Sequence, residues 1–275
     1  MDNKILKKLH DAEIEILDEV VRICDKYSLT YYLVGGTLLG AIRHHGFIPW
    51  DDDLDIAMPR KDYLIFLEVC TNELKPNFYY QSFDNCKIMT NNFAKIRKRN
   101  TLFVEEYLEK LQNDIEMGIF IDIFPLDSAK KEKGIQHVQK YFLERLTVLY
   151  MIKLGLGKHG LFKRFLAALF SKSVLLSLRQ WIVKFSNSAD SNYYINLGSQ
   201  YNITKQTILM SKYDPPIKVE FEGKFYNSPN DYDYVLRRIY GDNYMQLPPI
   251  EKRITHNPIR LCFDTNGPDE DLSEE

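Results

Sequence analysis

Four aspartates gather in one short run of the chain, WDDDLDIAM, which begins at Trp50. From Asp53 to Met58 polar and apolar residues alternate, the pattern of a strand with one wet and one buried face. Side chains two residues apart on a strand point the same way, so Asp51, Asp53 and Asp55 are expected on one face. No Lys or Arg in the local sequence neutralises them. These carboxylates therefore favour a divalent cation, Mg²⁺ or Mn²⁺, over the alternative of a solvated acidic turn.

A further acid interrupts an otherwise apolar run, GIFIDIF, from Gly118 to Phe124. Burying an isolated carboxylate at Asp122 would cost free energy unless something compensates its charge. A metal ion would do so, and so would the alternative partner, a buried Arg. Asp122 is therefore the candidate for a third carboxylate beside Asp53 and Asp55.

The segment LVGGTLLG precedes the acidic run. It is predicted to be a short strand that ends at Gly35 and Gly36, after which Thr37 opens a short helix. Glycine leaves the backbone N–H groups open to close approach, and the N-terminus of a helix attracts an anion. Gly-Gly-Thr alone is a common turn, but an acidic strand follows it here. The pattern predicts a phosphate site at Gly35, Gly36 and Thr37 beside a metal site.

Two basic residues alternate on a strand predicted from Asn92 to Lys98. Lys95 and Arg97 would point the same way, where they can bind a diphosphate. The alternative is ordinary surface charge on an amphipathic strand, to which Lys98 and Arg99 would add. The sequence leaves both interpretations open.

The elements that must hold these residues alternate between helix and strand in the first half of the chain. The second half is different, because one long stretch is almost wholly helical and breaks only at Gly155–Gly160. The spacing of apolar residues predicts helices over 4–28, 60–74, 134–187 and 231–240, and strands over 53–58, 78–83, 92–98 and 118–124, the last of them closed by Pro125. An α/β (α+β) fold with a helical subdomain is expected.

The composition is that of a soluble globular protein: 275 residues, 45% of them hydrophobic and 27% charged. The N-terminal residues contain no uninterrupted apolar run, so no signal peptide is predicted, and no stretch approaches the roughly 20 apolar residues that span a bilayer. The four cysteines are far apart and form no CxxC pair. That spacing argues against a zinc ribbon and a secreted disulfide framework, and a reducing cytoplasm is expected.

The formal net charge of −2 hides a strong asymmetry. Residues 134–185 contain nine Lys or Arg and one acid, a net charge of +8, interleaved with Leu, Phe and Trp, whereas the tail after Phe263 is acidic. We expect this basic stretch to bind an anionic membrane surface. The alternative is a helical subdomain that buries its apolar residues internally. Nucleic acid is not expected as a partner, because the basic region lacks a pattern of stacking aromatics.

Several segments together resemble the LicD family, the bacterial phosphocholine transferases that decorate teichoic acids and lipopolysaccharides, with the fukutin group as more distant relatives. The resemblance runs from Leu33 to His256 and is weakest over 130–215. The segments that carry it are LVGGTLLGAIRHHGFIPWDDDLDIAMPRKDY, FAKIRKRNTLF, GIFIDIFPLD and LRRIYGDNYMQLPP, followed by Arg253 and His256.

The resemblance implies a nucleotidyltransferase-like α/β core with a mixed β-sheet. The expected division is a catalytic core over 1–130, a mainly helical basic subdomain over 131–215, and a C-terminal segment over 216–275 that packs back on the core. By the same resemblance, the residues that match the family's catalytic and metal-binding carboxylates are Asp53, Asp55 and Asp122. The residues assigned to the nucleotide are Gly35, Gly36, Thr37, Arg43, Lys95 and Arg97.

The reaction that the resemblance implies uses CDP-choline, or a similar CDP-linked donor, with Mg²⁺ or Mn²⁺. The hydroxyl of a glycan or teichoic acid precursor, lipid-linked, would attack the phosphorus that bears choline, and CMP would leave. This places the protein at the inner face of the cytoplasmic membrane. One alternative is a nucleotidyltransferase that moves NMP from an NTP and releases pyrophosphate. The other is a non-catalytic membrane-associated relative, which the intact carboxylate set disfavours.

The spacer between Gly36 and Asp53 is longer than in typical nucleotidyltransferases. It contains Arg43, His44, His45 and Trp50, which are candidates for donor binding in this branch, although the basic residues also suit a helix C-terminus. A trimethylammonium group offers no N–H, so aromatic faces and an acid recognise it. The residues predicted to bind choline are Trp50, Tyr240, Asp242 and Tyr244. The alternative is that Trp50 packs against Pro49 and that YGDNY is an ordinary turn.

Overall fold

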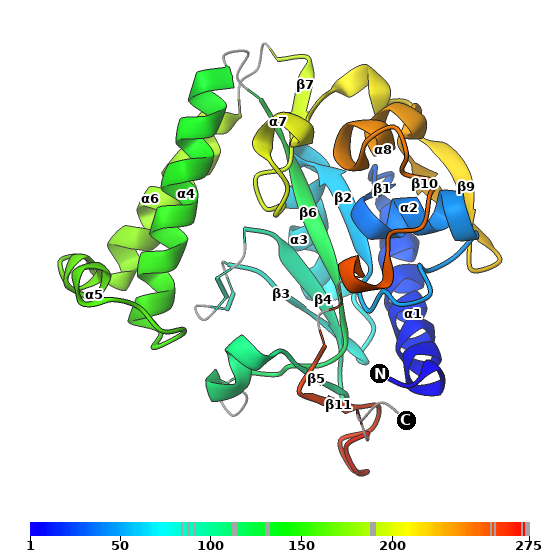
Figure 1. The fold of residues 1–275 in the computed structure, drawn as a ribbon, viewed down its shortest axis with the longest axis horizontal. Helices are drawn as coiled ribbons and strands as arrows, with labels where there is room; N and C mark the ends of the chain where they lie inside the picture. Colours follow the sequence, from blue (N-terminus) through cyan, green and yellow to red (C-terminus); the bar gives the residue numbers. More distant parts are fainter. Residues whose placement is uncertain are drawn as a thin grey trace.

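The computed structural model describes residues 1–83, 85–86, 89–90, 92–111, 115–129, 133–187, 191–253, 255, 257–270 and 272. It shows the expected α/β fold, a mixed sheet flanked by helices (Figure 1). The helices are α1 (Asn3–Tyr27), α2 (Gly35–His44), α3 (Arg60–Glu73), α4 (Lys133–Lys153), α5 (Leu161–Ala168), α6 (Lys172–Ser186), α7 (Ile203–Gln206) and α8 (Tyr232–Tyr240). The strands are β1 (Tyr32–Leu33), β2 (Asp55–Pro59), β3 (Phe78–Gln81), β4 (Ala94–Lys98), β5 (Leu102–Val104), β6 (Phe120–Ser128), β7 (Tyr193–Ile195), β8 (Thr207–Leu209), β9 (Ile217–Phe221), β10 (Lys224–Ser228) and β11 (Arg260–Cys262).

The sheet runs in the order β1-β2-β6-β4-β3, and β7 and β8 extend it from the far end of β6. β2 and β6 are parallel, whereas β4 pairs with β6 in the antiparallel sense. This register places Asp55 directly opposite Asp122, and Asp122 directly opposite Lys95. Three ionisable residues that are distant in the sequence therefore lie side by side across three strands.

Helix α1 confirms the amphipathic helix predicted at the N-terminus. Asp2 caps it by accepting from the backbone N–H of Lys4, and Ser28 ends it in the left-handed conformation. Its apolar stripe, including Leu9, Ile16 and Val20, is fully buried against the sheet. Each such side chain contributes about 1.5–3 kcal/mol through burial.

The predicted strand boundaries shift by a few residues, and two of these differences concern the strands of the acidic residues. β2 begins at Asp55 and not at Asp53, because Asp53 precedes the first residue paired with a neighbouring strand. β6 continues through Pro125 to Ser128. Pro125 lacks an N–H, but β4 pairs only as far as Ile123 and β7 pairs only from Asp127, so no strand on that side needs a donor there.

Helices α4, α5 and α6 stand beside the sheet as a separate arm (Figure 1). The break predicted at Gly155–Gly160 lies between α4 and α5. The chain then returns to the sheet, because Ile195 of β7 pairs with Asp127 of β6. The last part of the segment 131–215, which is expected to be mainly helical, forms β7, α7 and β8, and β7 pairs with both β6 and β8.

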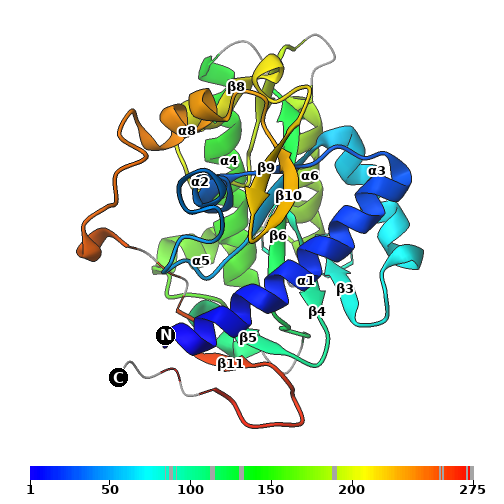
Figure 2. The same cartoon turned by 90° about the vertical axis from the view of Figure 1, so that its right-hand side faces the viewer.

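The C-terminal part covers the core from two sides. The hairpin of β9 and β10 contacts β1 and α2 (Figure 2), and β11 pairs with β5. Among the helices that the structure describes, none combines the length and the apolar character needed to cross a bilayer.

Candidate active site

The two glycines begin α2 and do not end the strand before it, so the helix starts two residues earlier than predicted. Gly35 has a φ of +57°, a conformation that side chains with a Cβ rarely adopt. A Cβ on Gly35 would lie 3.0 Å from Oδ2 of Asp55, and one on Gly36 would lie 2.6 Å from Oδ2 of Asp51. Only glycine lets the positive end of α2 approach the acidic run this closely.

Thr37 fastens the start of β2 to α2. Its hydroxyl oxygen accepts from the backbone N–H of Asp55 at 2.8 Å, and the backbone N–H of Val34 donates to the carbonyl of Asp55 at 3.2 Å. Thr37 was predicted to contact the phosphate. In the structure its side chain positions Asp55.

The three predicted carboxylates, Asp53, Asp55 and Asp122, line one cavity of about 200 Å³. Among the described residues Oδ1 of Asp55 is buried and has no hydrogen-bond partner. Burial raises the pKa of Asp55 well above its usual value, and the negative charges of Asp53, Asp122 and Asp51 raise it further. The site concentrates negative charge where little water reaches it.

The donor set was tested for a divalent cation. No group of three or more His, Cys, Asp or Glu side chains in the described part of the chain is arranged to hold a metal ion. Mg²⁺, however, usually takes one or two protein carboxylates and completes its shell with substrate phosphates and water. The buried oxygen of Asp55 that lacks a partner, opposite Asp122, fits that smaller requirement.

Lys95 and Arg97 are both buried, which rules out the surface-charge alternative. Nζ of Lys95 lies 2.8 Å from Oδ1 of Asp122 and 3.3 Å from the ring centre of Phe120. Asp122 thus has the basic partner considered in the sequence, although it is a lysine. Arg97 donates to the side chain of Gln81 and the carbonyl of Gly118. Its described contacts connect strands and do not face the cavity.

A segment without a sequence signal supplies much of the polar lining. Tyr201 donates to the hydroxyl of Tyr240 at 3.2 Å, and the two rings meet edge to face. Burial raises the pKa of both tyrosines, and the carboxylates of Asp51 and Asp55 raise it further. The other polar residues that this segment brings to the cavity are Asn196, Ser199, Gln200 and Gln206.

A further acid approaches the cluster from α1. Glu13 is fully buried, and its Oε2 has no partner among the described residues. Burial raises its pKa well above the usual value, and the charges of Asp53, Asp52 and Asp51 add to the shift. The sequence contains one indication that Glu13 is buried: it lies between Leu9 and Ile16, on the apolar face of the helix.

The four residues predicted to bind choline do not meet in one cavity. Trp50 lies against the guanidinium of Arg253, with 4.0 Å between the guanidinium carbon and the ring centre. The exposed side chain of Asp242 points to solvent, and the buried Tyr244 donates to Asp233 at 2.7 Å. Of the predicted set, Tyr240 alone is shown with a partner that lines the carboxylate cavity.

The guanidinium of Arg43 forms hydrogen bonds within the protein. It donates to the carbonyls of Tyr244 and Gln246, at 2.9 and 3.2 Å, and to the ring of His44. It therefore holds the segment after α8 against α2. His256, noted in the sequence for its resemblance alone, lies outside the described residues.

A mixed sheet that presents paired carboxylates beside a helix begun by Gly-Gly defines an α/β protein of the nucleotidyltransferase type. Residues 28–148 match the family model described as "LicD/FKTN/FKRP, nucleotidyltransferase domain". The chain is 30% identical over 254 residues to the lipopolysaccharide cholinephosphotransferase LicD of Haemophilus influenzae, covering 89% of this chain and 92% of that one. It belongs to the LicD family. A shorter stretch of 43 residues is 44% identical to human ribitol 5-phosphate transferase FKRP, covering 16% of this chain and 9% of that one.

Proposed function

We propose that the protein transfers phosphocholine, or a related aminoalcohol or polyol phosphate, from a CDP-linked donor to an acceptor hydroxyl and releases CMP. The acceptor is the hydroxyl of a lipopolysaccharide, glycan or teichoic acid precursor. The observation that carries this proposal is the in-register pair of Asp55 and Asp122 in one cavity beside the N-terminus of α2. The printed activity of the Haemophilus relative supports the transferred group.

The chain's own groups suit a diphosphate donor. The first turn of α2 offers backbone N–H groups and a positive helix end, and Gly35 and Gly36 keep Cβ atoms out of the approach. Asp55, Asp122 and Asp53 would hold Mg²⁺ or Mn²⁺ together with the donor phosphates. When bound, the cation screens the diphosphate and stabilises charge on the leaving oxygen.

We assign to Asp122 the role of binding the acceptor hydroxyl. Its carboxylate is held by the register of β6 and by the ammonium of Lys95. A carboxylate so positioned can accept the hydrogen bond of the attacking hydroxyl and direct its oxygen at phosphorus. Lys95 acts as the positioning residue for this group.

Aromatic side chains that face the cavity suit the cationic head of choline. Tyr201 lines the cavity and contacts Tyr240, and Phe93 and Phe124 lie on the same wall. A quaternary ammonium binds ring faces and nearby negative charge, both of which this cavity offers.

The helical arm is assigned to an anionic membrane surface, at the inner face of the cytoplasmic membrane. The alternative considered in the sequence, internal burial, holds for part of the arm, since Leu175 and Ile182 are buried, but other apolar residues are not covered: Leu161, for example, is 83% exposed. Basic residues alternate with them on α5, as in Lys163 and Arg164. Other exposed apolar residues of the arm include Phe162, Phe165, Leu169, Trp181 and Phe185.

The deciding experiment incubates the protein with Mg²⁺, a panel of CDP-linked donors and a short acceptor, and identifies the nucleotide product. Release of CMP, fastest from CDP-choline, is expected. If CTP gives pyrophosphate and the CDP-linked donors give nothing, the protein is a nucleotidyltransferase. If no nucleotide is consumed under any condition, the protein is not a transferase of either kind.

A further inference from the structure

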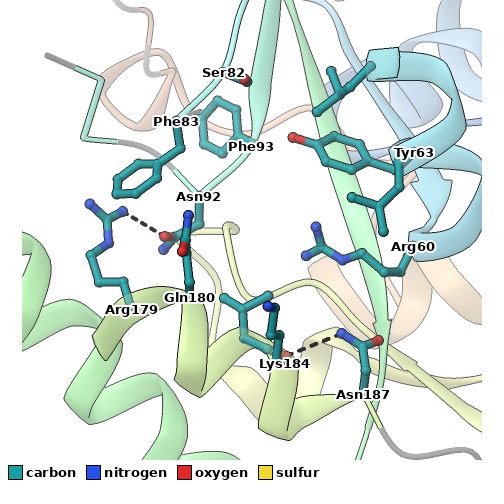
Figure 3. Close-up of a pocket in the computed structure, with 13 residues that line it drawn as sticks. Arg60, Tyr63, Ser82, Phe83, Asn92, Phe93, Arg179, Gln180, Lys184 and Asn187 are labelled. Carbon is teal, nitrogen blue, oxygen red and sulfur yellow. Dashed lines mark hydrogen bonds between the residues drawn. The ribbon is translucent and has the colours of Figure 1, made fainter. Parts of the chain in front are cut away.

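A second cavity, of about 520 Å³, lies between α3, α6 and the segment that joins β3 to β4 (Figure 3). Its walls are mainly apolar, with Leu64 and Leu67 from α3 and Val183 from α6. Two guanidinium groups, those of Arg60 and Arg179, lie on opposite sides of it (Figure 3). The assigned reaction residues Asp53, Asp55 and Asp122 are not part of its lining.

The two arginines differ in how their charge is compensated. Arg60 forms a two-point ion pair with the buried Asp127, at 2.7 and 2.8 Å. Arg179 is 1% exposed and forms no ion pair with any described acid. Its Nη2 donates to the carbonyl of Thr90 and the side chain of Asn92, while Nε and Nη1 have no partner among the described residues.

The surroundings of Arg179 do not replace a counter-ion. The guanidinium stacks under Phe83 at 4.4 Å and lies 5.9 Å from the ring centre of Tyr150. Burial lowers the pKa of Arg179 to about 10, so the group is still charged at neutral pH. A buried cation without an anion is costly, and two carbonyl-type acceptors and two rings compensate only part of that cost. A bound anion would supply the missing partner.

This cavity adjoins the carboxylate cavity. Phe93 lines both, and its ring packs 4.3 Å from that of Phe124, which lines the carboxylate cavity. A Cβ on Gly198 would lie 3.0 Å from Phe93 and 3.2 Å from Phe124, so Gly198 allows the two rings to form this wall. A molecule bound beside Arg179 is therefore one aromatic side chain away from Asp122.

We infer that the cavity between α3 and α6 is the acceptor subsite, and that it binds a phosphate group carried on an apolar chain. Arg179 would pair with the phosphate, the leucines of α3 would cover the apolar part, and the acceptor hydroxyl would pass Phe93 to reach Asp122. The role as acceptor subsite rests on the proposed function. The binding of an amphipathic phosphate does not, and can be measured without a donor.

The binding test uses isothermal titration calorimetry on the full chain with dodecyl phosphate below its micelle-forming concentration. Dodecyl maltoside and inorganic phosphate serve as the uncharged and the chain-free probes. Arg179→Leu removes the cation, and Leu64→Trp fills the cavity from a position that is 54% exposed and so spares the fold. Lys218→Leu, at an exposed position of β9 outside the arm and the cavity, is the control for lost charge.

We expect dodecyl phosphate to bind at least tenfold more tightly than either other probe. Arg179→Leu should weaken it about tenfold or more, as expected for the loss of a hydrogen bond to a charged group. Leu64→Trp should weaken it to a similar extent, because the larger side chain occupies the space of the apolar chain. The control should bind like the parent protein. Equal binding of the maltoside or of inorganic phosphate overturns the assignment, and so does an equal effect of Lys218→Leu.

Kinetics then separate the two ideas. With a phosphate-bearing acceptor, Arg179→Leu and Leu64→Trp should raise KM for the acceptor about tenfold and leave the slow release of CMP to water unchanged. If CMP is released but neither variant changes the acceptor KM, the subsite is wrong and the proposed function stands. If no CMP is released while dodecyl phosphate binds as expected, the anion site stands and the proposed function fails.

Discussion

Asp55 combines three features that rarely occur together in one carboxyl group. It is held by a strand register and by Thr37, it has a buried oxygen without a described partner, and its pKa is raised by burial and by neighbouring acids. In the isolated protein these features cost stability, since a negative charge is kept in a dry, negative environment. A cation and a diphosphate would reverse the cost, which ties the stability of this site to its ligand.

The substitutions Asp53→Asn and Asp55→Asn should therefore lower turnover by about 10² to 10³, the usual effect of losing one electrostatic stabiliser. Both should leave the melting temperature of the apo protein unchanged or raised, because repulsion between carboxylates falls. CMP release and thermal denaturation measure the two effects, with Asp11→Asn, at an exposed pair on α1, as control. Near-normal turnover in either variant, or full turnover in excess EDTA, would contradict a metal site.

Recognition of choline should depend on Tyr201 more than on Trp50. Tyr201 lines the carboxylate cavity, whereas the ring of Trp50 already stacks with Arg253. We expect Tyr201→Leu to lower kcat/KM for CDP-choline several-fold more than for CDP-glycerol, because a cation–π contact contributes about 0.5–2 kcal/mol. Trp50→Leu should lower both by the same factor. If Trp50→Leu lowers kcat/KM for CDP-choline more than for CDP-glycerol, and Tyr201→Leu lowers both equally, the choline group binds to Trp50 and not to Tyr201.

At this scale the sequence predicted the residues that form local patterns. Asp55, Asp122 and the two glycines were identifiable because alternation and Gly-Gly-Thr are short-range signals. Tyr201 and Glu13 were not identified, because their roles depend on which segments the fold brings to the cavity. The apolar position of Glu13 was the one signal within reach. The cluster at YGDNY was a local pattern too, but packing directs Asp242 and Tyr244 elsewhere.

At the scale of elements, the buried carboxylate of Glu19 connects α1 to the end of α3. Glu19 accepts from Arg22 at 2.8 and 2.9 Å and from the backbone N–H of Lys75 at 2.9 Å, and Arg22 also donates to the carbonyl of Glu73. Burial favours the neutral acid, but the hydrogen bonds from Arg22 and Lys75 outweigh it and lower the pKa of Glu19 to about 2. The ionised form thus connects the two helices that pack on the sheet.

A group whose pKa is lower in the folded chain contributes stability above its unfolded pKa and loses it as the pH falls towards the folded value. Glu19→Gln should therefore lower the free energy of unfolding by about 1–3 kcal/mol at pH 7, after allowance for the exposed Lys75 and part-exposed Arg22. The difference from the parent protein should shrink between about pH 4.5 and pH 2. Urea denaturation at several pH values measures it. A difference that does not vary with pH would show that the link is not electrostatic.

Helices were predicted more accurately than the pairing of strands. α1, α3 and α8 follow from apolar residues at helical spacing, which is a property of consecutive residues. The hairpin of β9 and β10 and the pair of β5 and β11 were missed, because pairing depends on partners that a short window does not contain. Pro125 misled for the same reason: its effect depends on which neighbours β6 has at that position.

Many of the exposed apolar residues of the molecule lie on the arm, together with basic residues. Exposed rings on α5 and α6 are numerous, and a large apolar patch on a protein surface usually marks a binding site. Figure 1 shows the arm beside the sheet, on the side opposite to β9 and β10. The arm would then carry the acceptor cavity to the place where a lipid-borne acceptor is anchored.

Anionic vesicles in low salt should sediment with more of the protein than neutral vesicles do. The double substitution Phe162→Ser and Phe165→Ser should reduce the bound fraction at least threefold, since the apolar side chains no longer enter the interface. The matched control is Phe225→Ser, a 67% exposed aromatic on β10, outside the arm. Equal recovery with anionic and neutral vesicles would rule out the membrane assignment.

The arm begins and ends at neighbouring points of the sheet. β6 and β7 are antiparallel and Ser128 lies opposite Tyr194, so the two strands have the geometry of a hairpin whose turn has been replaced by some sixty residues. A hairpin turn needs only about two to five residues. An arm of another length could therefore join these strands while Asp55 and Asp122 keep their register. Because α6 also lines the cavity assigned to the acceptor, a change in the arm would alter which acceptor and which surface the protein meets, while the carboxylates stay in place.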